Sequence, residues 1–77
     1  MTAHNATPES AKLVRMANQI AAYFHAYPEA TALAGVRKHL VDFWTPRMLQ
    51  DLRAHAGDAG LDKLVQQVIP SLPEKAA

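Results

Sequence analysis

The 77-residue chain contains no cysteine. This absence excludes disulfides, thiolate metal sites, iron–sulfur ligation and cysteine nucleophiles. A charge excess is also missing, because 8 Lys and Arg against 7 Asp and Glu give a net charge of +1, far from the basic patch of a nucleic-acid-binding domain. No apolar run approaches the ~20 residues of a membrane span, and the N-terminus lacks the pattern of a signal peptide. We therefore expect a soluble, cytoplasmic protein with neither a nucleic acid nor a membrane as partner.

Motifs that carry chemistry are missing too. None of the three glycines stands between a strand and a helix, as a phosphate-binding loop requires. The histidines are His4, His25, His39 and His55, and none has another histidine three or four residues away, so a preformed metal-ligand pair is absent. His39 could pair with Asp42 across one helical turn, and His55 could pair likewise with Asp51. Because no nucleophile accompanies them, we predict that the chain is not an enzyme by itself and has no catalytic, cofactor-binding or metal-binding residues.

Hydrophobic residues make up 49% of the chain, but 15 of them are alanine, which leaves few large side chains for a core. A domain of this size buries only ~60% of the surface of its unfolded chain and seldom gains more than ~3–5 kcal/mol from its core. We therefore expect the chain to be stabilised by a partner.

Four segments carry helix signals. The first begins at Thr7-Pro8-Glu9, where threonine can cap the helix, and ends at Tyr27-Pro28. Its apolar stripe consists of Leu13, Met16, Ala17, Ile20, Phe24 and Tyr27. The second runs from Pro28-Glu29 to Trp44, and its apolar face is wider than one neighbouring helix requires.

The third helix is predicted from Pro46 to about Ala56, with Thr45 as its cap and Gly57 as a left-handed stop. The fourth is short, begins after Asp62 and ends at Pro70. No segment shows the alternating pattern of a strand. The sequence predicts one all-α domain over 1–77, a small antiparallel bundle of three main helices plus a short C-terminal helix, ordered over about 7–70 with flexible ends at 1–6 and 71–77.

Gly35 stands inside the second helix, where glycine costs about 1 kcal/mol relative to alanine. Either it is a tolerated surface glycine, or another backbone approaches closely over the shoulder formed by Ala32, Gly35 and His39. Trp44 likewise has two interpretations: it fills the core with Arg47 over an aromatic face, or it belongs to an interface, where Trp and Arg are common. The predicted partner interface comprises Gly35, His39, Phe43, Trp44, Pro46, Arg47 and Met48.

The sequence also resembles a known family over about 13–69. The resemblance rests on the blocks Met16-Ala17-Asn18-Gln19-Ile20, Tyr27-Pro28-Glu29, Gly35-Val36, His39-Leu40 and Phe43-Trp44-Thr45-Pro46-Arg47-Met48. These blocks are similar to the delta subunit of soluble NAD-dependent molybdenum formate dehydrogenases. The family commonly begins its fourth helix with Ser-Pro, where this chain has Leu61-Asp62-Lys63, so no functional role carries over from that region.

The resemblance implies a cofactor-free accessory subunit that docks on the catalytic alpha subunit and supports its stability, assembly or cofactor loading. It further implies that the partners carry the chemistry of formate oxidation: molybdopterin and iron–sulfur clusters in alpha, and FMN with further clusters in beta and gamma. One alternative is a transient assembly chaperone for the alpha subunit. Another is a small helical DNA-binding regulator, suggested by Arg47, Gln50 and Arg53 on the third helix but opposed by Asp51 and the low net charge.

Overall fold

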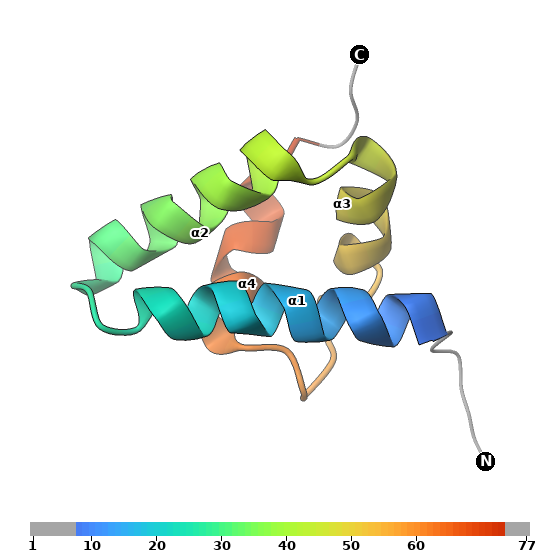
Figure 1. Ribbon diagram of the computed structural model, residues 1–77, viewed down its shortest axis with the longest axis horizontal. Coiled ribbons are helices and arrows are strands. Elements are labelled where there is room, and N and C mark those ends of the chain that lie inside the picture. The colour runs from blue at the N-terminus through green and yellow to red at the C-terminus, as the bar shows by residue number, and fades with distance from the viewer. Residues whose placement is uncertain (1–7, 74–77) are drawn as a thin grey trace.

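The computed structural model describes residues 8–73, which form four α-helices and one 3-10 turn (Figure 1). The elements are α1 (Pro8–Phe24), α2 (Glu29–Phe43), α3 (Pro46–Arg53), α4 (Lys63–Val68) and η1 (Ile69–Ser71). No strand occurs among the described residues, so the all-α prediction is confirmed. The expected cap at Thr7 and the chain ends 1–6 and 74–77 lie outside the described residues.

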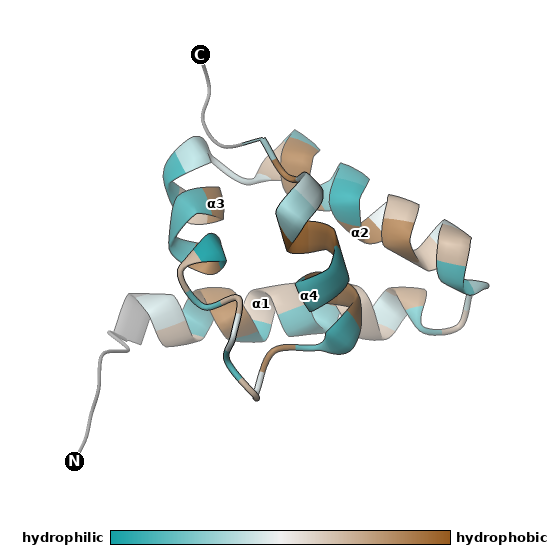
Figure 2. Ribbon diagram, turned by 180° about the vertical axis from the view of Figure 1, so that it is seen from behind, coloured by the Kyte–Doolittle hydropathy of each residue, from teal (hydrophilic) through white to brown (hydrophobic). Residues whose placement is uncertain are grey.

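The four helices do not all run side by side. α1 and α2 form an antiparallel hairpin, whereas the short helices α3 and α4 cross α1 (Figure 1). α4 lies behind α1 and α2 in Figure 1 and in front of them in the reverse view of Figure 2. The predicted antiparallel arrangement therefore applies to α1 and α2 only, and the short helices α3 and α4, with 8 and 6 residues, pack across them.

The core lies where these helices meet. Its buried side chains are Leu13, Ala17, Ala21, Ala32, Val36, Leu40, Trp44, Leu49, Leu52, Leu61, Leu64, Val65, Val68, Ile69 and Leu72. The fully buried alanines of α1 and α2 let the two helices approach closely. Leu72 is 3% exposed, so the core extends past the end of α4 into the segment that follows it.

Two helix ends differ from the prediction. α1 stops at Phe24 instead of reaching Tyr27, and the Tyr27 amide donates to the Phe24 carbonyl in a turn before Pro28. α3 stops at Arg53 instead of Ala56. The chain leaves α3 through successive turns, which include a bond from the His55 amide to the Leu52 carbonyl.

The predicted caps are present at the starts of α3 and α4, but the one predicted at the end of α3 is absent. Gly57 does not adopt the left-handed backbone expected of it, since the turns after α3 already redirect the chain. Thr45 Oγ1 accepts a hydrogen bond from the Met48 amide at 3.1 Å, and the Asp62 carboxylate accepts one from the Leu64 amide at 2.9 Å. Both predicted caps are therefore confirmed.

Side chains of α1 hold the start of α4. Asn18 Nδ2 donates to the Gly60 carbonyl at 2.8 Å, and Asn18 Oδ1 accepts from the Asp62 amide at 2.7 Å. His25 Nε2 lies 2.8 Å from Asp62 Oδ2. A single asparagine thus bonds two backbone groups of the loop that precedes α4, while His25 bonds the residue that caps it.

Two arginines hold the segment that follows α4. The half-buried Arg53 guanidinium donates to the carbonyls of Ile69 at 3.4 Å, Leu72 at 3.1 Å and Pro73 at 2.9 Å. Arg37 adds a bond to the Ser71 carbonyl at 3.2 Å. These bonds tie the segment 69–73 to α2 and α3.

Candidate partner interface

The polar side chains that hold the C-terminal segment define one side of the molecule. Asn18 of α1 and Arg37 of α2 both contact the stretch 60–73. A helix turns about 100° per residue, so the side chains of two residues that are two positions apart point about 200° apart, to nearly opposite sides of the helix. On α1 that residue is Met16, two positions before Asn18. On α2 it is His39, two positions after Arg37.

The opposite side of α1, α2 and α3 carries apolar and aromatic side chains, and we call it the open face. On α3, Met48 stands five positions before Arg53, about 140° around from the contact with the C-terminal segment. On α1, Tyr23 follows Met16 by seven residues and therefore lies on the same line of the helix. The open face comprises Met16, Ile20, Tyr23, Phe24, Gly35, His39, Phe43 and Met48.

Large aromatic rings are exposed on the open face. Phe43 is 73% exposed and Tyr23 is 65% exposed. The His39 ring lies 4.9 Å from the Phe43 ring, and the Tyr23 ring meets Phe24 edge-on at the same distance. Water surrounds much of these rings in the free chain, so covering them would stabilise a complex.

The ring of Phe24 explains why position 35 is a glycine. A Cβ at Gly35 would lie 2.6 Å from Cζ of Phe24 and 2.7 Å from its Cδ1, which is too close for two carbon atoms. Glycine therefore lets the Phe24 ring lie on the backbone of α2. The close approach was foreseen, but the group that approaches is a side chain of α1 and not another backbone.

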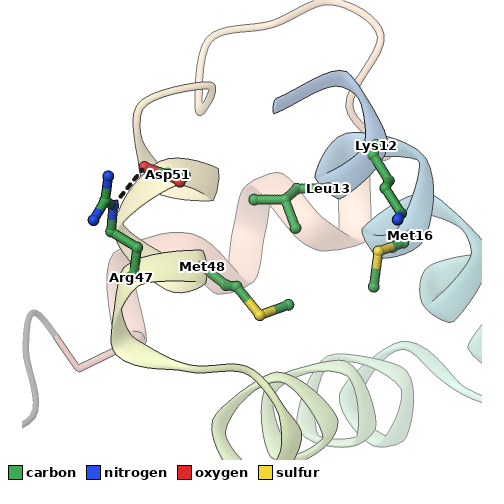
Figure 3. A pocket seen from close by; sticks show the side chains of 6 residues that line it. All are labelled: Lys12, Leu13, Met16, Arg47, Met48 and Asp51. Atoms are coloured by element: carbon green, nitrogen blue, oxygen red, sulfur yellow. Dashed lines mark ion pairs between the residues drawn. The ribbon is translucent and has the colours of Figure 1, made fainter. Parts of the chain in front are cut away.

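A hollow of about 380 Å³ lies between α1 and α3 at one end of the open face. Its lining residues are Lys12, Leu13, Met16, Arg47, Met48 and Asp51. In Figure 3, Met48 points from α3 across the hollow toward α1, and Lys12 lies beside Met16. α4 lies behind the hollow in this view. The hollow therefore opens on the side away from α4.

The densest predicted segment divides between core and surface. Trp44 is 7% exposed and packs in the core, which is the first of its two interpretations. Pro46 is exposed in the first turn of α3. The Arg47 side chain is 82% exposed and extends toward Asp51, with 3.9 Å between Nε and Oδ1. Trp44 thus supports this corner from inside and offers almost no surface to a partner.

The expected histidine–aspartate pairs are both wrong. Asp42 pairs with Lys38, with 2.7 Å between Nζ and Oδ2, and the His39 ring contacts the Phe43 ring at a tilt of 43°. His55 lies near Asp58, with 3.7 Å between Nδ1 and Oδ2. The two predicted partners, Asp42 and Asp51, instead pair with Lys38 and Arg47, each one turn away on the same helix.

Two features of this site were not predicted from the sequence. Tyr23 is the first, although its spacing of seven from Met16 places both residues on one line of α1. The second is the hollow that Lys12 and Leu13 line with α3, because its position depends on how the two helices cross. Among the described residues, no group of three or more His, Asp or Glu side chains could hold a metal ion.

Among residues 8–73, no helix is both long and apolar enough to cross a membrane.

Comparison with known proteins gives no similar curated protein and no similar solved structure. The family model for the NADH-dependent formate dehydrogenase delta subunit FdsD matches residues 12–69, which include α2, α3, α4 and nearly all of α1. The chain belongs to this delta-subunit family of formate dehydrogenase.

Proposed function

We propose that the chain is a non-catalytic accessory subunit that docks through its open face on the catalytic alpha subunit of formate dehydrogenase. The observation that carries this proposal is the exposure of two aromatic residues, Phe43 and Tyr23, on the open face. A small domain that leaves such a face in water gains free energy when a partner covers it. In the assembled enzyme, molybdopterin, iron–sulfur clusters and FMN reside in alpha, beta and gamma, and this subunit holds none of them.

The effect on the catalytic subunit follows from mass action. A ligand that binds the folded state of a protein and not its unfolded state raises the stability of that protein. Docking therefore raises the melting temperature of alpha and keeps it folded during assembly and cofactor loading. The same linkage stabilises the small subunit, whose own core is limited.

The test is a binding measurement with purified alpha subunit and full-length chain. The wild-type chain binds alpha and raises its melting temperature, and Phe43→Ser weakens this binding because it removes the most exposed ring of the open face. Gln67→Ser is the control, since Gln67 is exposed on α4, outside the open face.

Two results would contradict the proposal. If the wild-type chain neither binds alpha nor changes its melting temperature, the chain is not a docked subunit of alpha. If Gln67→Ser weakens binding more than Phe43→Ser does, the docking surface is not the open face. A chain that binds only immature alpha and leaves before turnover would instead be the transient chaperone.

A further inference from the structure

The hollow between α1 and α3 combines an apolar floor with a charged rim. Leu13, Met16 and Met48 form the floor. Methionine side chains are flexible and polarisable, so they adapt to the shape of an inserted apolar group. Because the hollow measures about 380 Å³, it has room for such a group from another chain.

The rim carries more positive than negative charge. Lys12 and Arg47 provide two cations, and Asp51 provides one carboxylate. The single ion pair between Arg47 and Asp51 is long, with 3.9 Å between Nε and Oδ1, and the arginine side chain is 82% exposed. One additional carboxylate would therefore balance the rim.

Arg47 does not stabilise α3 by its place in that helix. Arg47 stands in the first turn of α3, where the positive end of the helix repels a cation. The guanidinium can form a two-pronged pair with a carboxylate, a geometry that lysine cannot reproduce. In Figure 3 the guanidinium lies beside Asp51 on the outer side of α3, and its 82% exposure leaves that fork accessible from outside.

From these observations we infer that the hollow receives a segment of the alpha subunit in which an acidic residue stands beside an apolar one. The apolar side chain lies on the floor of Leu13, Met16 and Met48, and the carboxylate pairs with Arg47, while Lys12 adds positive charge on the α1 side of the hollow. This inference rests on the proposed docking to alpha and adds the chemistry of the segment that is recognised. The hollow continues the open face, because Met16 and Met48 belong to both.

Charge variants of the full-length chain test the inference against purified alpha. Arg47→Glu weakens the affinity by about tenfold or more, as expected when a charge-assisted hydrogen-bonded pair is lost and replaced by repulsion. Lys12→Glu weakens it less, and Arg47→Lys gives an intermediate affinity. Lys63→Glu is the matched control, because it makes the same charge change at an exposed position of α4. Its affinity for alpha should stay within about twofold of the wild type.

A photo-cross-linking amino acid at position 48 identifies the occupant directly. The cross-linked peptide should come from alpha and contain an Asp or Glu within a few residues of the attachment point. A cross-link to beta or gamma, a peptide without an acidic residue, or no cross-link to bound alpha would overturn the inference. If wild-type chain and alpha bind each other but Arg47→Glu and Lys63→Glu have equal affinities, docking stands and this inference fails. If the wild type does not bind alpha, the proposed function itself fails.

Discussion

Asn18 is the side chain on which the attachment of α4 to α1 most directly depends. Its Nδ2 donates to the Gly60 carbonyl at 2.8 Å, and its Oδ1 accepts from the Asp62 amide at 2.7 Å. Asn18→Ala removes both bonds, at about 1 kcal/mol each. Alanine returns roughly 0.5 kcal/mol as the better helix former. The net loss is therefore about 1.5 kcal/mol, which lowers the melting temperature by roughly 6–12 °C in a domain of this size.

The assay is urea denaturation and thermal melting of the full-length chain, followed by far-UV circular dichroism. Gln19→Ala is the matched control, because Gln19 is the exposed neighbour of Asn18 and its change should stay within about 0.5 kcal/mol. Asn18→Asp keeps the acceptor for the Asp62 amide, loses the donor to Gly60 and adds a carboxylate near that of Asp62. It should destabilise the chain as well. Equal stabilities of Asn18→Ala and Gln19→Ala would refute the assigned role of Asn18.

Three further predictions concern other contacts. Arg53→Met removes the three carbonyl bonds to the segment after α4 and should cost about 1.5–3 kcal/mol, with faster proteolysis in that segment; unchanged proteolysis would contradict it. Gly35→Ala should stabilise the chain by about 1 kcal/mol in a Phe24→Ala background but less, or not at all, when Phe24 is present; additivity in this double-mutant cycle would show that the ring does not compete for the space. The hydrogen bond with Tyr23 raises the pKa of Tyr27, so Tyr23→Phe should lower that pKa toward its ordinary value in an absorbance titration. Because the folded-state pKa of Tyr27 is raised, the stabilisation that this hydrogen bond gives the fold is present below the unfolded-state pKa of Tyr27. It is lost as the pH rises through the folded-state pKa.

The helices were predictable because their signals are local. Thr45 and Asp62 cap their helices as expected, since a cap depends only on residues two or three positions away. The extent of α3 was overestimated because an apolar pattern continues through His55 and Ala56, whereas the chain already turns there. The core position of Leu72 and the bond that its carbonyl accepts from Arg53 were not predictable from local signals, because both involve residues distant in the sequence.

The candidate interface was only partly predictable for the same reason. The exposure of Phe43 and His39 on one side of α2 follows from helical spacing once the opposite side is known to contact the C-terminal segment. The hollow beside Arg47 depends on how α3 crosses α1, and no local pattern encodes that crossing. Gly35 signalled a close approach correctly, but the identity of the approaching group, Phe24, required the hairpin geometry.

The most direct test of the central claim is hydrogen–deuterium exchange of the full-length chain with and without the alpha subunit. Docking through the open face predicts slower exchange in the peptides 12–24 and 39–51 when alpha is present. Peptides from 61–69, on the α4 side, should change least. Strongest protection over 61–69, or no protection anywhere at saturating alpha, would contradict docking through the open face.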